Sequence, residues 1–213
     1  MGELLTTPSE ISARRRRSDG ERSRAAILYA ATQLATVEGL DGLSIGRLAE
    51  HTGMSKSGLY AHFGSKEELQ LATIDAASEI FVREVIEPAK AAEGAARLQA
   101  LTDAFLSYLE RRVFPGGCFF AAAQAELDTH PGQVREKLRE TGQRWHSYIE
   151  RQVRGAQEMG ELDQAEDPAQ LAFELDAMLK MATAVFMLQD DAEALERARR
   201  GVSDRVERAK IGA

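Results

Sequence analysis

The segment 55–66 is dense in side chains that donate hydrogen bonds, and it carries two ammonium groups. Among the donors are Ser55, Lys56, Ser57, Tyr60, His62 and Lys66. Hydroxyl and ammonium groups bind phosphate oxygens, and a lysine can also reach the acceptors of guanine in a major groove. Gly58 and Ala61 between them leave room for a close approach. The chemistry that these residues predict is nucleic-acid recognition rather than catalysis.

Ser44 and Arg47 extend this set toward the N-terminus. Ser44 precedes an apolar-periodic segment and is a natural helix cap, and the free amides at such a helix start bind anions. The same residue types also suit purely structural roles: Tyr60 as a boundary core residue, His62 as a packed histidine, and the serines as helix caps. Both interpretations stay open at the level of the sequence.

A pair of short helices joined by a tight turn would present these donors. Ala49 is small, Gly53 follows four positions later, and Leu59 follows six beyond that. A small residue lets two helix axes approach, a glycine takes positive φ in the turn, and an aliphatic residue packs back from the second helix. We therefore expect a helix-turn-helix, with one helix over about 45–51 and another between Ser55 and Gly64.

Three segments follow from this unit: a flexible basic arm at 1–18, a DNA-binding head at 19–64, and a body at 65–213. The arm lacks hydrophobic periodicity and contains four consecutive arginines. It is either a solvated tail or an arm that enters the adjacent minor groove. Ser65 and Glu68 have the spacing of a capping box and predict a long helix that joins head to body and ends near Ile86.

The body reads as helix throughout, with no segment that alternates long enough for a strand. Helices are expected at about 94–113, 117–129, 132–160, 168–189 and 192–210. The predicted fold class is therefore all-α, a three-helix head with a helix-turn-helix on a larger helical bundle.

The formal net charge of −7 is unevenly distributed. Residues 1–66 carry nine Lys/Arg against seven Asp/Glu, whereas residues 67–213 carry eighteen against twenty-seven, so the excess of acid lies in the body. The one cysteine, Cys118, excludes an intrachain disulfide, and no apolar run reaches the roughly eighteen residues of a membrane span. We expect a cytoplasmic protein without a membrane partner.

No arrangement typical of an enzyme stands out. The sequence lacks a phosphate-cradling glycine loop, a paired-histidine helix, a nucleophile elbow and a Cys-x-x-Cys pair. Glu126, Asp128 and His130 could be imagined as metal ligands, but alternate residues of a helix face different ways, and a solvated helix end explains them better. We expect no catalytic residue, no metal and no cofactor. A helical adaptor whose head binds a protein is the remaining alternative.

Three motifs resemble the tetracycline-repressor (TetR) family: LSIGRLA at 43–49, GMSKSGLYAHF at 53–63 and SKEEL at 65–69. This combination is far more specific than a helix-turn-helix alone. Gly46 and Ala61 replace larger polar residues common in relatives, which bears on operator preference. A weaker match to one branch of the family lies in GGCFF at 116–120, with ELD at 126–128 and PG at 131–132.

The resemblance implies a ligand-responsive transcriptional regulator, in most cases a repressor. Such a protein binds a palindromic operator in double-stranded DNA as a homodimer and is released by a small-molecule effector held in the body. From the residue types and the resemblance together, the expected DNA contacts are Ser44, Arg47, Ser55, Lys56, Ser57, Tyr60, His62 and Lys66.

The last two helices are the expected homodimer interface, at about 168–210. Residues 168–189 are apolar nearly all round, so this helix must be covered on more than one face. One face can line the interior of the body while another meets the twin subunit. A monomer that covers both faces internally is the alternative.

The effector candidates come from helices that the family arranges around its pocket. They are Phe105, Tyr108, Cys118, Phe119, Trp145, Tyr148, Phe173 and Met181. Most of them are expected to be plain core, and aromatic residues with polar tips are favoured as ligand contacts because a buried polar group needs a partner. Cys118 as a redox sensor is an alternative, although a lone cysteine in an apolar run is usually an inert small hydrophobe.

Overall fold

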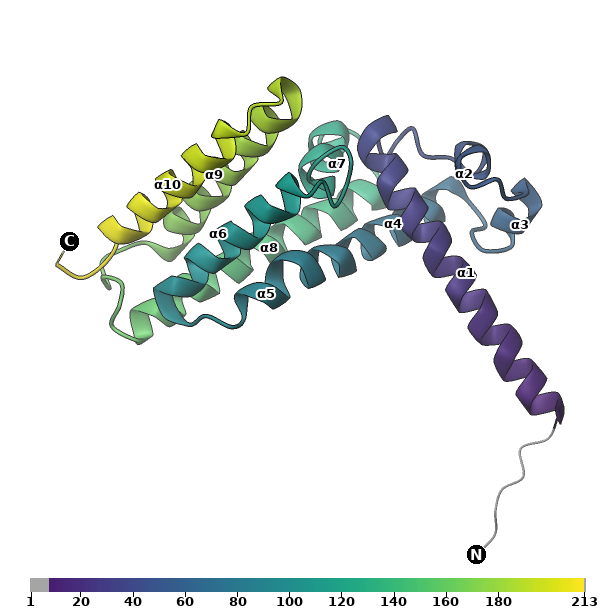
Figure 1. Cartoon of the computed structure of the whole chain (residues 1–213), viewed down its shortest axis with the longest axis horizontal. Helices are drawn as coiled ribbons and strands as arrows, with labels where there is room; N and C mark the ends of the chain where they lie inside the picture. The colour runs from purple at the N-terminus through teal and green to yellow at the C-terminus, as the bar shows by residue number, and fades with distance from the viewer. Residues whose placement is uncertain (1–7, 213) are drawn as a thin grey trace, which may run out of the picture.

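The computed structural model describes the backbone of residues 8–212 and the side chains of residues 20–212. Within that range the chain forms helices and no β-strand, so the predicted all-α class is confirmed. Figure 1 shows short helices gathered at one end of a larger bundle, into which helix α4 (Lys66–Phe81) runs from the head. No helix in the described range is long and apolar enough to cross a membrane.

The head consists of α1 (Pro8–Glu38), α2 (Ile45–Thr52) and α3 (Lys56–Tyr60). Both short helices start where the sequence predicts, because Ser44 Oγ accepts from the Arg47 amide at 3.2 Å and Ser55 Oγ accepts from the Gly58 amide at 3.1 Å. Gly53 turns the chain between them with φ +69°. The helix-turn-helix is therefore present.

Helix α1 begins earlier than the sequence predicts. Its backbone is helical from Pro8, where the sequence analysis expects a flexible arm up to Ser18. The absence of hydrophobic periodicity argues against packing but not against a helix, because Ala, Arg and Glu have high helix propensity and proline suits the first helical position. The arm is therefore corrected to helix for residues 8–18. Residues 1–7 and the arginine side chains at 14–17 lie outside the described residues.

Helix α4 (Lys66–Phe81) leads from the head into the body. Ser65 Oγ accepts from the Glu68 amide at 3.1 Å, as predicted. The Glu68 carboxylate accepts from the Gly64 amide at 2.8 Å, one residue earlier than in a capping box. The start of α4 is thereby fixed beside the end of α3.

The expected long helix is not uniform up to its end. Residues Val82–Ile86 wind as a π-helical segment, η1, and α5 (Glu87–Ala89) follows. Pro88 has no amide hydrogen to close an ordinary turn, and the Glu87 amide donates to Val82 O, five residues back. The wider turn lies where the helix borders the interior of the body.

The body contains α6 (Gly94–Glu110), α7 (Phe119–Leu127), α8 (Gln133–Glu158), α9 (Pro168–Gln189) and α10 (Glu193–Arg208). Each lies within a few residues of its predicted range. α8 packs against α4, α6, α7 and α9, and α10 covers α9 and α6. The helices α9 and α10 run side by side along one flank of the bundle (Figure 1).

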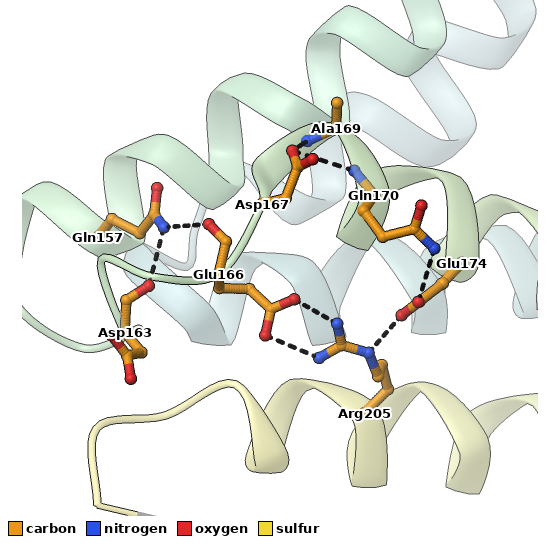
Figure 2. Close-up of polar contacts among 8 residues, drawn as sticks. All are labelled: Gln157, Asp163, Glu166, Asp167, Ala169, Gln170, Glu174 and Arg205. Atoms are coloured by element: carbon orange, nitrogen blue, oxygen red, sulfur yellow. Dashed lines mark hydrogen bonds and ion pairs between the residues drawn. The ribbon is translucent and has the colours of Figure 1, made fainter.

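A charged network fastens the loop between α8 and α9 to α10 (Figure 2). Arg205 donates to the carboxylates of both Glu166 and Glu174, and only 14% of its side chain is exposed. Gln157 Nε2 donates to the backbone oxygens of Asp163 and Glu166, each at 2.9 Å. Because the Arg205 guanidinium donates to a carboxylate of the loop and to a carboxylate of α9, it ties α9 and α10 together within a single chain.

Candidate DNA-binding surface and effector cavity

The exposed side of α3 and the start of α2 meet at a residue without a side chain. Leu59 is fully buried and anchors α3, whereas Lys56 is exposed and 57% of Tyr60 is exposed. A Cβ built on Gly46 would lie 3.8 Å from both Lys56 Nζ and Ser44 Oγ. Lys56 Nζ and Ser44 Oγ therefore both lie beside Gly46 at the start of α2, so that donors from both helices gather there.

Both cations at the border of this surface are paired with carboxylates of the head. Lys66 Nζ lies 2.9 Å from Asp41 Oδ1, and the hydrogen bond and charge of Lys66 hold the pKa of Asp41 below its usual value. Arg47 donates to Glu38 at 2.9 Å and to Glu50 at 2.7 Å. All of these side chains are at least partly exposed, so solvent and salt weaken the pairs, and a phosphate can displace the carboxylates.

His62 takes an intermediate position at the end of α3. Its ring is half-buried and lies 6.2 Å from the ring of Phe63, which is buried in the core. The Arg24 guanidinium of α1 covers the Phe63 ring, 4.9 Å from its centroid. This contact, which the sequence analysis missed, packs α1 against the end of α3.

The body encloses an open cavity of about 1110 Å³. Its walls come from α4, η1, α6, α7, α8 and α9. The aromatic rings in the lining are Phe81, Phe105, Phe120, Trp145 and Tyr148. The rings of Phe81 and Trp145 pack in a T-shaped arrangement with centroids 5.2 Å apart, and the rings of Trp145 and Tyr148 stack with centroids 6.3 Å apart. A cavity of this size and lining suits an aromatic or amphipathic small molecule.

Half of the effector candidates line the cavity, namely Phe105, Cys118, Trp145 and Tyr148. Tyr108 and Phe119 are buried behind the wall as core residues. Phe173 and Met181 lie on the outer side of α9, where 60% and 64% of them are exposed, so their assignment to the cavity is corrected. Both residues were predicted as effector contacts, but the face of α9 that carries them points away from the cavity.

Asp176 is a buried carboxylate at the cavity that the sequence analysis missed. Its Oδ1 accepts a hydrogen bond from Trp145 Nε1 at 2.8 Å, and its Oδ2 lies 2.8 Å from Lys180 Nζ and 2.6 Å from His146 Nε2. Burial opposes its ionisation, but the Lys180 ammonium and these hydrogen bonds outweigh it and hold the pKa of Asp176 below its usual value. The signal that could have found it is an acid that lies at helical spacing on the same side of α9 as the apolar residues Leu175 and Leu179, with Lys180 four residues further on.

Cys118 lies in the wall with its thiol buried. Burial raises the pKa of this thiol, and burial likewise raises the pKa of Tyr108 beside it. Because the thiolate is the reactive form, a protonated thiol at neutral pH disfavours the redox-sensor interpretation. The Tyr108 hydroxyl is buried and makes no hydrogen bond among the described residues.

The outer side of α9 carries a continuous apolar stripe. Its members are Phe173, Ala177, Met181, Ala184 and Leu188, all of them exposed. They recur at intervals of three and four residues, so they form one helix face. The opposite face of α9, with Leu175 and Leu179, is buried inside the body. Apolar residues on both sides of one helix fit a helix that meets a second partner.

Two family models match this chain. "Bacterial regulatory proteins, tetR family" covers residues 27–73, and "Tetracyclin repressor-like, C-terminal domain" covers residues 94–202, which is more than half of the 213 residues. The chain belongs to the TetR family. This TetR-family protein is therefore a transcriptional regulator with a helix-turn-helix DNA-binding domain.

Known relatives agree with this assignment. The HTH-type transcriptional regulator LmrA of Bacillus subtilis (strain 168) is 30% identical over 138 residues, which cover 62% of this chain and 71% of that protein. A TetR transcriptional regulator from Chloroflexus aurantiacus J-10-FL superposes with a TM-score of 0.84 at 27% identity, covering 91% and 98% of the two chains. AibR, crystallised with isovaleryl coenzyme A and operator DNA, shares the fold with a TM-score of 0.64 at 23% identity, covering 84% and 95%.

The Asp176 cluster predicts a pH-dependent loss of stability. Asp176→Asn removes the charge that pairs with Lys180, and we expect it to cost about 1–3 kcal/mol of unfolding free energy at pH 7, as for a hydrogen-bonded charge that loses its partner. The lowered pKa of Asp176 means that its contribution is present above the unfolded value of about 3.9 and is lost as pH falls through the folded value.

Urea unfolding followed through Trp145, the one tryptophan, measures both effects. The difference between the native protein and Asp176→Asn should shrink as pH is lowered from about 7 toward 3. A difference that stays constant over this range would show that the carboxylate charge is not what stabilises the cluster. Asp128→Asn, on an exposed acid at the end of α7, is the matched control.

Proposed function

We propose that this TetR-family regulator is a homodimeric repressor that binds a palindromic operator and leaves it when a small-molecule effector occupies the cavity. One observation carries the proposal. Helix α4 begins at Lys66, close to the end of α3. At its far end, α4 and η1 supply cavity-lining residues, among them Phe81 and Val82. Because one continuous helical segment touches both places, a ligand at one end has a covalent route to the other.

The two proposed functions are assigned to successive parts of the chain. Residues 19–64 form the DNA-binding domain, and residues 65–213 form the domain that binds effector and partner. α3 is proposed to enter the major groove, and Lys56 is the residue proposed to read a base. The proposed DNA contacts are Ser44, Arg47, Ser55, Lys56, Ser57, Tyr60, His62 and Lys66.

Binding is proposed to exchange intramolecular partners for phosphate. Lys66 and Arg47 would release Asp41, Glu38 and Glu50 when the backbone of DNA arrives. The exposed position of these pairs supports this, because each is worth little in water, whereas displacement of counterions from DNA favours binding. The Asp41 carboxylate then remains as a nearby negative charge that penalises a poorly aligned phosphate.

The effector is proposed to be an aromatic or amphipathic molecule in the cavity. The rings of Phe81, Trp145 and Tyr148 would hold its apolar part, and the cluster around Asp176 would orient its polar part. AibR, a protein of this fold, was crystallised with both a ligand and operator DNA, which supports two-ligand binding for the architecture. The chemistry of that ligand is not transferred to this chain.

The partner subunit is proposed to cover the apolar stripe of α9. A second copy brings an identical stripe, and a two-fold axis would set the same residues of both chains against each other. The helix α10 beside it is charged on its exposed side, with Arg200 and Asp204 among its residues, which suits the polar rim of an interface. Two heads related by this axis would read half-sites about 34–36 Å apart.

The stripe predicts a specific change in oligomeric state. Met181→Glu places a charge in the centre of the interface, where it would be buried without a partner. We expect the variant to sediment as a folded monomer at micromolar concentration and to lose at least tenfold in operator affinity. Met159→Glu, at an exposed methionine after α8, is the control and should remain dimeric. A native protein that sediments as a monomer and still binds operator fully would exclude the dimer.

The phosphate role of Lys66 predicts a change in salt dependence. Lys66→Ala should weaken binding to all DNA sequences by a similar factor and lower the slope of log affinity against log salt by about one unit. Lys210→Ala, on an exposed lysine paired with Glu207 far from the head, is the control. Fluorescence anisotropy of labelled duplexes between about 50 and 200 mM salt measures the slope. An unchanged slope for Lys66→Ala would exclude the phosphate contact.

The effector response predicts reciprocal affinities. If an effector lowers operator affinity tenfold, it favours the non-binding state by about 1.4 kcal/mol, and operator DNA must weaken effector binding by the same factor. Compounds found by thermal shift can be titrated into free and operator-bound dimer, with Trp145 emission as the signal. Equal affinities for every compound that fills the cavity would leave a constitutive DNA-binding protein as the better description.

A further inference from the structure

The turn between α1 and α2 is held by a carboxylate from the body. Glu126, in the last turn of α7, accepts from the Leu40 amide at 2.7 Å and from the Asp41 amide at 3.0 Å, one at each oxygen. The fit is tight, because a Cβ on Gly39, which has φ +85°, would lie 2.5 Å from Glu126 Oε1. The interpretation of Glu126 as part of a solvated helix end is therefore wrong.

Helix α7 also forms one wall of the cavity. The lining residues from α7 and its N-terminal cap are Cys118, Phe120, Ala121 and Gln124. The helix packs against both α1 and α8. It is a short helix with cavity contacts in its first turns and Glu126 in its last. The carboxylate that holds the turn and the cavity-lining residues therefore belong to one helix.

The held turn touches one of the proposed phosphate contacts. Glu126 fixes the backbone of Asp41, and the side chain of Asp41 pairs with Lys66 Nζ at 2.9 Å. The Leu40 carbonyl accepts a buried hydrogen bond from Gln70 Nε2 at 2.8 Å, which ties the same turn to α4. The contacts thus run without a gap from the cavity wall through Glu126 and Asp41 to Lys66.

We propose that Glu126 is a positioning residue that transmits the state of the cavity to the DNA-binding head. The proposal rests on the proposed effector response and adds a second route, through α7, to the route along α4. The two hydrogen bonds that Glu126 accepts have a charged acceptor, so they are strong, and they act at the turn between α1 and α2 of the head. Coupling of this kind is reciprocal, so DNA bound at the head must also change the cavity.

Reciprocity allows a test that needs no effector. Trp145 is the one tryptophan of the chain and lines the cavity, so its emission and its quenching by acrylamide report on the cavity alone. The full-length dimer is saturated with an operator duplex recovered by binding from random DNA, and the Trp145 response is recorded. The variants are Glu126→Gln, which keeps the size but offers one acceptor, and Glu126→Asp, which keeps the charge but is one methylene too short to reach both amides.

The proposal expects the Trp145 response to operator to fall by about threefold or more in both variants, because cavity and head are coupled through this carboxylate. The Leu40 and Asp41 amides should exchange hydrogen about tenfold faster or more, as for loss of a charged hydrogen bond. Asp128→Asn, two residues further on in an exposed position, removes the same charge and should keep the full response. Urea unfolding verifies that each variant is folded.

The outcomes separate the proposal from the function on which it rests. If the native dimer binds operator with a Trp145 response, and both Glu126 variants retain that response, the role of Glu126 is overturned but the proposed regulator stands. If the Leu40 and Asp41 amides exchange faster in the variants but the Trp145 response to operator is unchanged, Glu126 stabilises the turn without transmitting the state of the cavity. If the native protein binds operator and Trp145 does not respond, the coupling itself is refuted. If the native protein selects no DNA sequence, the proposed function fails first.

Discussion

The largest apolar core of the described residues runs without interruption from the DNA-binding head into the body, and it fixes how the head sits on the bundle. Ile27 and Leu59 of the head, Ile74 of α4, and Phe105 and Phe186 of the body all belong to one buried cluster. Because close-packed side chains transmit displacement rather than absorb it, the orientation of the head depends on the packing of the body. A regulator needs this dependence, and a head on a flexible linker would lack it.

The charges at the head favour discrimination between DNA sites over a high affinity for DNA in general. The acidic body repels DNA, and the cations beside the reading surface, Lys66 and Arg47, already have carboxylate partners. In the proposed complex a phosphate would have to replace Asp41 or Glu38 in the right geometry, and a misplaced one would gain little. The overall charge of −7 is therefore compatible with DNA binding, because the local field at the groove matters more than the net charge.

Features that depend on a few neighbouring residues could be predicted from the sequence. Ser44 and Ser55 cap their helices and Gly53 takes positive φ, and all three were predictable because helix capping and turn formation act within a few residues. Contacts between distant segments were not predictable in this way: Glu126 reaches a turn 85 residues away, and the place of Asp176 at the cavity depends on how α8 meets α9. The residues of the apolar helix α9 were recognised, but which face turns inward depends on the assembled bundle, so Phe173 and Met181 were placed in the cavity instead of outside it.

Two copies of this chain are proposed to read DNA through α3 as a symmetric pair whose head positions are set by the body. Selection of bound fragments from a random DNA pool, followed by sequencing, tests it most directly. The account predicts an inverted repeat whose half-sites lie about one helical turn, or roughly 34–36 Å, apart or at a multiple of that spacing. Enrichment of a single asymmetric site, or no enrichment above the input pool, would contradict it.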